Sequence, residues 1–370
     1  MNILMVVTWY GEKGKDFFTG NFHYELAKAL QKSHNVAIYF PFDNVNEKGV
    51  RYEEEGGILT FRNNIGATKF NRMVNIYADI KKIKAIYEPD IIHAHVANGA
   101  GLVALFAKKI FRIPYVLTEH APIEMMNFSK KGKLKTSFIL SNSKANIAVS
   151  TDLRDKLNKI YKKANFSCIY NGVIDPYLIM SQNVDNYRVE NCVNAVIMCG
   201  LYSKTIKGLQ YLLPAIEMVN KSSKKVHLHI CGGGNYLEYF IDMSKKIGIE
   251  NDVTFYGMCD KPLMYSILNQ MDFAISASLY ESAGVSVEES CMMGKPMVVT
   301  KSGGANSLIP DVYSIKIEVG SEKALCNALN TMIDTYKNYD SEEMKNYGFS
   351  NFEMEKICQK YEKIYSREEI

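Results

Sequence analysis

The chain has 370 residues, of which 47% are hydrophobic and 23% charged, and its formal net charge is +4. This length is enough for two domains with cores of their own, and the composition is that of an ordinary globular protein. So small a net charge gives no reason to expect nucleic-acid binding. All eight cysteines lie from Cys168 onward without a C-x-x-C pair, so we expect buried thiols of a reducing compartment rather than disulfides or a metal site.

The first residues enter an apolar strand pattern directly, without the order of basic, apolar and small residues that marks a signal peptide. The apolar runs are all shorter than the roughly 18 residues that a membrane-spanning helix needs. We therefore expect a cytoplasmic protein whose membrane contact, if any, is peripheral and at the inner face.

Short apolar strands alternate with helices through the first half. The expected strands are 2–8, 36–40, 91–95, 115–118, 146–149 and 166–169. The expected helices are 20–33, 71–87, 102–111 and 151–161. This alternation predicts a parallel sheet with helices on both faces.

Ligands of such sheets bind at the carboxyl ends of the strands, so the loops there are candidate sites. The loop after the first strand ends in Gly20, at the start of a helix, where backbone amides can approach a phosphate. Many loops end this way, so the feature alone is weak. No G-x-G-x-x-G follows the first strand, which argues against a nicotinamide or flavin enzyme.

Three histidines lie at the ends of the expected strands 91–95 and 115–118. His93 and His95 point the same way on a strand and could form a metal pair, but no carboxylate or cysteine of suitable spacing completes it. We favour a structural or acceptor-lining role for them and expect no metal site. His120 follows Thr118 and Glu119. There it could hydrogen-bond a sugar hydroxyl and stabilise charge that develops in the reaction, or it could have only a structural role as a capped residue of its loop.

Two basic clusters stand in the first half, at 108–112 and 130–135. Solvated helix faces would explain them. The alternative is a docking surface for anionic lipid or for a phosphate-bearing acceptor.

The second half repeats the plan. Its expected strands are 194–199, 227–231, 253–256, 273–276 and 296–300. Its expected helices are 208–220, 236–247, 263–270 and a short one from Val285 or Ser286 to Gly294, ahead of Pro296. About eleven strands would be many for one open sheet, so we predict two doubly wound domains, with the boundary in the polar segment 175–191.

Two glutamates frame the most informative segment. Glu281 stands on the loop after strand 273–276, and Glu289 lies eight positions later, inside the short helix. The residues that open this helix are small enough for their amides to approach an anion: Ser282, Ala283, Gly284 and Val285. Carboxylates accept from hydroxyls and amides donate to phosphates, so the segment suits a phosphorylated polyhydroxy ligand. Taken alone, a solvated acidic helix would show the same two glutamates.

The flanking motifs resemble the E-x7-E region of family 4 retaining glycosyltransferases (glycosyl transferases group 1). Ser-Leu-Tyr precedes Glu281, Gly294-Lys295-Pro296 follows the helix, and Ser302-Gly303-Gly304 lies beyond the next strand. The resemblance covers almost the whole chain. It implies the α/β GT-B fold, in which two Rossmann-like domains with doubly wound parallel sheets face a central cleft. The implied domains are 1–175, which binds the acceptor, 176–350, which binds the nucleotide sugar, and 351–370, a helix that returns to the first domain.

The resemblance also implies roles for residues of the donor site. Glu289 would accept from ribose hydroxyls and Glu281 from a hydroxyl of the donor sugar. The amides of 282–285 would meet the sugar and diphosphate. Lys207, which precedes Gly208 at a helix start, would take phosphate charge.

Other positions match less closely. Gly20 corresponds to the first glycine loop of the family, and Gly200, Gly232 and Met258 correspond to positions around the nucleotide. Leu201 stands where an arginine is usual, so half of the usual diphosphate clamp is in doubt, and Lys204 could supply the missing charge.

The implied enzyme is a retaining hexosyltransferase with His120, Glu281 and Lys207 as catalytic residues. It would move a sugar from a nucleoside diphosphate sugar such as a UDP-sugar to an acceptor hydroxyl, in polysaccharide or glycolipid synthesis, with a sugar or lipid-linked acceptor as partner. No D-x-D pair is placed to hold a metal, so we expect metal-independent catalysis and no cofactor besides the sugar nucleotide. A sugar-nucleotide epimerase or a phosphorylase on the same fold, and a non-catalytic sugar-nucleotide-binding module, remain as alternatives.

Overall fold

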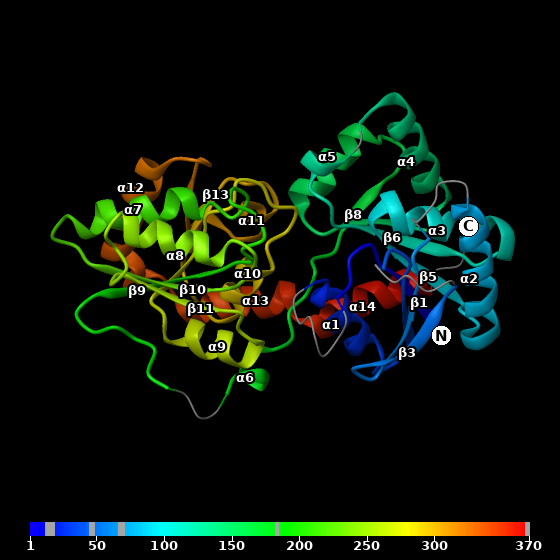
Figure 1. Ribbon diagram of the computed structural model, residues 1–370, viewed down its shortest axis with the longest axis horizontal. Helices are drawn as coiled ribbons and strands as arrows, with labels where there is room; N and C mark the ends of the chain where they lie inside the picture. The colour runs from blue at the N-terminus through cyan, green and yellow to red at the C-terminus, as the bar shows by residue number, and fades with distance from the viewer. Residues whose placement is uncertain (12–18, 44–48, 66–70, 127, 182–184, 367–370) are drawn as a thin grey trace. The chain divides into compact units, whose positions relative to one another are not determined.

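The computed structural model describes residues 1–11, 19–43, 49–65, 71–126, 128–181 and 185–366 (Figure 1). The chain forms two compact units. The first combines Met1–Asn171 with Met354–Ile370, and the second is Gly172–Glu353. The boundaries expected from the sequence lie after residues 175 and 350. Each unit is a layered α/β domain, as expected.

The first unit contains an eight-stranded sheet in the order β3-β4-β2-β1-β5-β6-β7-β8. Its strands are β1 (Asn2–Val6), β2 (Asn35–Phe40), β3 (Arg51–Glu55), β4 (Ile58–Arg62), β5 (Ile91–His95), β6 (Tyr115–Glu119), β7 (Asn146–Ala148) and β8 (Phe166–Cys168). All neighbours pair in parallel except β3 and β4, which form an antiparallel hairpin at the edge. Strands β1 and β5 are almost wholly buried, so they form the centre of the core.

The helices of the first unit are α1 (Asn21–Leu30), α2 (Arg72–Tyr87), α3 (Gly101–Phe111), α4 (Lys130–Asn142), α5 (Thr151–Ile160) and α14 (Met354–Tyr365), with a short π-helical turn at Val96–Ala100 and a 3-10 turn at Ile123–Met125. The C-terminal helix α14 packs on α1. It buries Ile357, Tyr361 and Tyr365 on one face. These residues explain why the last helix belongs to the first unit.

The second unit contains a six-stranded, all-parallel sheet in the order β11-β10-β9-β12-β13-β14. Its strands are β9 (Val193–Met198), β10 (Val226–Cys231), β11 (Val253–Gly257), β12 (Phe273–Ser276), β13 (Met297–Thr300) and β14 (Ser314–Ile317). Numbered from β9, the order reads 3-2-1-4-5-6, that of a dinucleotide-binding Rossmann sheet. The strand order reverses between β9 and β12.

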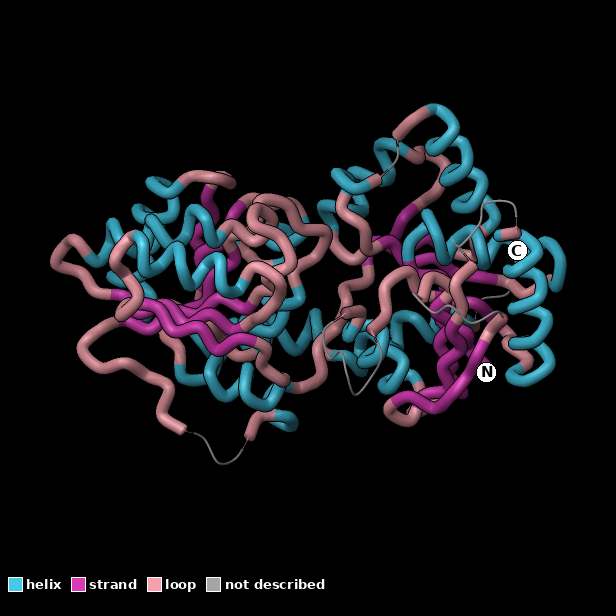
Figure 2. Tube along the Cα trace, viewed as in Figure 1, coloured by secondary structure: helices cyan, strands magenta, loops and turns pink. Residues whose placement is uncertain are grey.

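The helices of the second unit are α6 (Pro176–Ile179), α7 (Leu209–Asn220), α8 (Leu237–Lys246), α9 (Lys261–Gln270), α10 (Val285–Met292), α11 (Gly304–Leu308), α12 (Glu322–Thr335) and α13 (Ser341–Phe352), with 3-10 turns at Asp311–Tyr313 and Tyr336–Asn338. Figure 2 shows helices on both faces of this sheet. Its core is built from buried aliphatic residues of β9, β10 and α7, against which α12 packs. In the described part of the chain, no helix is both long and apolar enough to cross a membrane.

Candidate active site

The loops after β9 and β12 of the second unit meet at the carboxyl edge of the sheet. These two strands flank the point where the strand order reverses, and open α/β sheets bind ligands at that point. The amide of Leu279 donates to the carbonyl of Ile206 at 2.8 Å, which ties the two loops together. The sequence placed Lys207 and Glu281 on these loops.

Lys207 and Glu281 form an ion pair in the structure. The Lys207 Nζ to Glu281 Oε2 distance is 2.7 Å, and Ser278 Oγ donates to the same oxygen at 3.2 Å. Burial lowers the pKa of Lys207, but the charge and hydrogen bond of Glu281 outweigh it, so the net pKa is raised and the ammonium stays charged. Both side chains remain partly exposed, at 30% and 22%, so a ligand can reach them.

Two glycines allow the backbone to pack closely around this pair. Gly208 is the left-handed N-cap residue of α7, and a Cβ there would lie 1.9 Å from the carbonyl oxygen of Ala277. A Cβ on Gly232 would lie 1.8 Å from the carbonyl oxygen of Cys199. No other residue type fits either position without moving the backbone. The first turn of α7 is thereby held against the loop that carries Glu281.

The loop between Glu281 and α10 is held by the segment after β13. The Glu281 amide donates to the Ser302 carbonyl at 2.8 Å, and the Gly304 amide donates to the Glu281 carbonyl at 2.7 Å. Gly284 follows with a φ of 137°, and α10 starts at Val285, one of the two starts that the sequence predicted. The amides of Ser282–Val285 therefore stand on a fixed loop at a helix N-terminus, where anions are favoured.

Glu289 lies inside α10 and is buried. Its Oε1 accepts from the Tyr265 hydroxyl at 3.0 Å and lies 3.3 Å from the Lys261 ammonium. The carboxylate is thus held in place by α9. An ionised carboxylate has about four lone-pair sites, so it can accept from a ligand in addition to these partners.

Leu201 departs from the family pattern, and Lys204 is the residue that could supply the missing charge. Leu201 is fully buried and belongs to the hydrophobic core of the second unit. Its apolar side chain therefore offers no charge to a phosphate. Lys204 lies over the ring of Tyr239, 4.3 Å from its centroid, and also near Tyr236. The structure brings Lys204 to these tyrosines, and a role at the diphosphate stays a prediction.

The remaining donor-site candidates gather around the ends of β9, β10 and β11. Met258 is half exposed and packs against Gly233, where a Cβ would lie 2.6 Å from the methionine Cγ. Gly200 packs against the ring of Tyr202, at the end of β9. Gly232 and Met258 thus lie next to the ends of these strands, and their role around the nucleotide stays a prediction.

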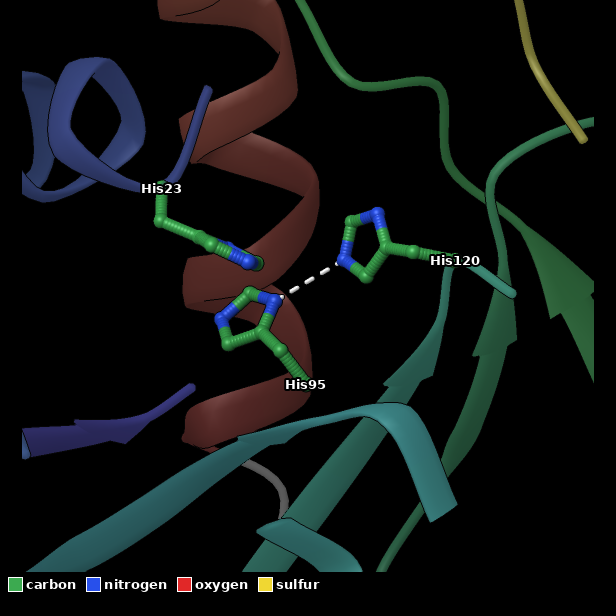
Figure 3. Close-up of side chains that lie close together, drawn as sticks. All are labelled: His23, His95 and His120. Atoms are coloured by element: carbon green, nitrogen blue, oxygen red, sulfur yellow. Dashed lines mark hydrogen bonds between the residues drawn. The ribbon is translucent and has the colours of Figure 1, made fainter. Parts of the chain in front are cut away.

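The first unit brings together histidines from three elements. His23 comes from α1, one turn after Gly20, while His95 is the last residue of β5 and His120 follows β6. The His95 Nδ1 to His120 Nε2 distance is 2.9 Å, a hydrogen bond, and Figure 3 shows His23 pointing toward this pair. Gly20 is needed at the start of α1 because a Cβ would lie 2.3 Å from the carbonyl oxygen of Trp9.

The imidazoles of His93, His95 and His120 are neutral. Burial lowers the pKa of His93 and His120 to about 3, and burial together with the neighbouring imidazoles holds the pKa of His95 well below its usual range. His93 is occupied by two further partners, since its ring nitrogens are hydrogen-bonded to Thr118 Oγ1 at 2.8 Å and to the Tyr365 hydroxyl at 2.7 Å. A neutral His120 can accept or donate one hydrogen bond to a ligand without carrying charge.

Among the described residues, His23, His95 and His120 are the group able to hold a metal ion, with one nitrogen from each within 4.8 Å of the others. Neutral imidazole nitrogens suit zinc and similar ions. A metal pair of His93 and His95 was the only arrangement that the sequence suggested. The structure instead combines His95 with His23 and His120.

Glu119 fixes the loop of His120. Its carboxylate is fully buried and accepts from the amides of Ala97 at 3.0 Å, His120 at 3.0 Å and Ala121 at 2.9 Å. Burial raises the pKa of Glu119, and these three amides oppose that rise. The ends of β5 and β6 are thereby joined by one side chain.

Two family descriptions match most of the chain. Glycosyltransferase Family 4 matches residues 19–175, and Glycosyl transferases group 1 matches residues 187–350. The chain belongs to the family 4 glycosyltransferases of group 1. Its relatives include alpha-monoglucosyldiacylglycerol synthase of Streptococcus pneumoniae, 25% identical over 72% of this chain and 65% of that protein. A human phosphatidylinositol N-acetylglucosaminyltransferase polypeptide is 21% identical over 93% of this chain and 72% of its own length.

Solved glycosyltransferase structures share the fold. Sucrose-phosphate synthase from Thermosynechococcus elongatus has a TM-score of 0.80 at 17% identity, covering 99% of this chain and 98% of that one. HepE from Anabaena, crystallised with UDP and glucose, has a TM-score of 0.75 at 18% identity, covering 99% and 100%. The predicted GT-B fold is confirmed. The chain spans 65% of the streptococcal synthase and 64% of an uncharacterized glycosyltransferase of Methanocaldococcus jannaschii.

Sequence reasoning missed several residues of this glycosyltransferase. Glu119 stands between Thr118 and His120 in the sequence, but only the fold shows that it holds two loops. His23 is an ordinary histidine of an amphipathic helix, and no spacing links it with His95. Tyr265 and Lys261 belong to α9 and reach Glu289 across the unit. A single sequence carries no signal for such long-range partners.

Proposed function

We propose that this glycosyltransferase moves a hexosyl group from a UDP-sugar to an acceptor hydroxyl with retention of the anomeric configuration. The observation that carries the proposal is the Lys207–Glu281 pair at the switch point of the second unit, beside the N-terminus of α10. A cation and the amides of a helix start suit a diphosphate, and two carboxylates suit ribose and sugar hydroxyls. HepE, which shares the fold, was crystallised with UDP-glucose, in support of a UDP-sugar donor.

Each residue has one role in this proposal. Glu289 accepts from the ribose hydroxyls, Glu281 accepts from a hydroxyl of the transferred sugar, and Lys207 neutralises charge on the departing diphosphate. His120, in the acceptor-binding unit, hydrogen-bonds a sugar hydroxyl through a neutral imidazole, since burial keeps its pKa low. The family pattern supplies no carboxylate nucleophile, so we infer attack from the same face that the diphosphate leaves. The bond from the anomeric carbon to phosphate oxygen breaks, the bond to the acceptor oxygen forms, and the acceptor proton passes to the phosphate.

We also propose a peripheral membrane contact through α3 and α4. These helices pack together, so the two basic clusters of the sequence lie on neighbouring elements. Apolar side chains stand exposed among the lysines, with Leu134 at 72% and Phe138 at 55%. Such a surface suits an anionic bilayer, and a lipid-linked acceptor fits the names of the streptococcal and human relatives. We expect the protein to co-sediment with anionic vesicles but not with neutral ones. Failure to co-sediment with either type would contradict this contact.

Titration of purified protein with nucleoside diphosphate sugars tests the donor site. We expect UDP-sugars to bind, Lys207→Met to weaken them by about tenfold or more, and Lys221→Met, which removes an exposed lysine at the end of α7 in the same unit, to leave them unchanged. Turnover should persist in EDTA. A UDP-sugar that is bound but converted without any acceptor would favour an epimerase, and binding without any conversion would favour a non-catalytic module.

A further inference from the structure

A cavity in the first unit lies where ligands of parallel sheets bind. Its volume is about 280 Å³, and its lining includes Thr8, Asn98 and Gly99. Thr8 follows β1, while Asn98 and Gly99 follow β5. The sheet order reverses between these two central strands, so the cavity stands at the switch point of this unit. The Thr8 hydroxyl donates to the His95 carbonyl at 2.9 Å, which joins the two strand ends.

The described lining of this cavity contains two cations and no carboxylate. Arg72, the first residue of α2, and Lys135, from α4, both border it. Neither makes an ion pair with any described residue, and the one hydrogen bond of the Lys135 ammonium to a described partner is a long contact of 3.4 Å to Asn98 Oδ1. Burial and the charge of Arg72 lower the pKa of Lys135, so the two cations repel each other. An anion between them would remove that repulsion.

The backbone around the cavity is arranged for close approach. Val96 has a φ of 80°, which a β-branched residue rarely adopts, and Gly99 has a φ of 131°. A Cβ on Gly99 would lie 3.2 Å from Thr8 Oγ1. This turn leads directly into α3, and Leu102 in its first turn lines the cavity, so the positive end of that helix faces the two cations.

A second cavity of about 190 Å³ adjoins the first and shares Thr8, Asn98 and Lys135 with it. Its lining includes Glu119 and Ala121, the two neighbours of His120. A molecule bound across both cavities would place an anionic group between Arg72 and Lys135 and a hydroxyl-bearing part beside the His120 loop.

We propose that the first cavity binds a phosphate group carried by the sugar acceptor, with Arg72 and Lys135 as its ligands. The inference rests on the proposed function in that it assigns the phosphate to the acceptor. The binding itself does not depend on glycosyl transfer. A water-soluble phosphate ester and a lipid headgroup present the same group to the two cations, and the two arms of the test distinguish them.

Calorimetric titration of the full chain with glycerol 3-phosphate tests the site, with UDP present in excess to fill the donor site. We expect Arg72→Gln and Lys135→Gln each to weaken binding at least tenfold. Arg72→Lys, which keeps the charge, should restore most of the affinity. Lys81→Gln, which removes an exposed charge from the same helix α2, should change the affinity less than about twofold.

A parallel arm uses vesicles of phosphatidylcholine with and without phosphatidylglycerol. If the protein binds anionic vesicles but not neutral ones, and this binding depends on Arg72 and Lys135, the result supports the site and identifies a lipid headgroup as the source of the phosphate. If neither glycerol 3-phosphate nor vesicles distinguish a double variant carrying Arg72→Gln and Lys135→Gln from Lys81→Gln, the proposal is overturned. Failure of UDP to bind the wild-type protein would instead count against the proposed function. The comparison of variants at Arg72 and Lys135 would still report whether the cavity binds phosphate.

Discussion

At the scale of single residues, the proposed donor site depends on side chains that already have protein partners. Glu281 is paired with Lys207, and Glu289 is held by Tyr265 and Lys261. A diphosphate sugar entering this site would add contacts to groups that are already ordered. Preorganisation of this kind reduces the entropy cost of binding.

Glu289→Ala should therefore have two separable effects. Donor affinity should fall about tenfold or more, because one contact between a carboxylate and hydroxyls is lost. Thermal stability should also fall, because the buried hydroxyl of Tyr265 and the Lys261 ammonium lose their contacts with this carboxylate, at a cost of about 1–3 kcal/mol. Tyr265→Phe serves as the control: it should lower the melting temperature while leaving most of the donor affinity. Unchanged donor affinity in Glu289→Ala would rule out the ribose contact.

The sequence could indicate which residues lie on a given loop, because these residues are consecutive. It could not indicate which side chains pair with each other when they are far apart in the chain. The pairing of Lys207 with Glu281 joins residues 74 positions apart. Leu201 stands where the family has an arginine, and the structure places its side chain in the core of the second unit. Burial is a property of the folded unit and cannot be read from one position of a pattern.

At the scale of elements, glycines determine how closely the helices approach the strands. Gly208 and Gly248 provide a matched pair, with φ values of 73° and 74°. A Cβ on Gly208 would lie 1.9 Å from a backbone oxygen, whereas nothing lies within 4 Å of one on Gly248.

Gly208→Ala should destabilise the protein more than Gly248→Ala. The backbone strain of about 1 kcal/mol is common to both, so the difference in melting temperature measures the close approach of α7 to the β12 loop. Donor affinity should fall only in Gly208→Ala, because Lys207 moves with the first turn of α7. Equal melting temperatures for the two variants would mean that the close approach of Gly208 to the β12 loop does not contribute to stability.

Most of the parallel strands and several of their helices were predicted from apolar runs and periodicity, and α10, expected from Val285 or Ser286, begins at Val285. Strands β3, β4 and β14 and helices α4, α12 and α13 were missed. Strand β3 reads Arg-Tyr-Glu-Glu-Glu and is exposed, so it lacks the apolar pattern of a buried strand. Helix α4 begins Lys-Lys-Gly-Lys and was interpreted only as a basic cluster, since its apolar face is short.

At the scale of the whole molecule, buried neutral histidines make stability depend on pH. The pKa of His93 is about 3 in the folded protein and about 6.5 when unfolded, so the unfolded chain binds more protons between these values. Stability is therefore full above about pH 6.5 and falls as the pH is lowered. The slope is about 1.4 kcal/mol per pH unit for each such histidine.

His93→Gln should be less stable than wild type at pH 7, because it disturbs the bonds to Thr118 and Tyr365. The difference should shrink by about pH 5, since the variant no longer has to keep an imidazole neutral. Fluorescence of Trp9, the only tryptophan of the chain, reports unfolding of this unit. A stability difference that stays constant between these two pH values would mean that the pKa of His93 is not lowered in the folded protein.

Two Rossmann-like units with their ligand loops at the strand switch points form a framework for joining a donor to an acceptor. In the proposed reaction, the Lys207–Glu281 pair of the second unit activates a UDP-sugar, and the sugar is transferred with its configuration retained. Proton NMR of a UDP-α-sugar incubated with the protein and a phosphate-bearing sugar or lipid acceptor measures this directly. We expect a product with an α-anomeric signal and the loss of that signal in Lys207→Met. A β-anomeric product, or unchanged turnover in Lys207→Met, would contradict the proposed reaction.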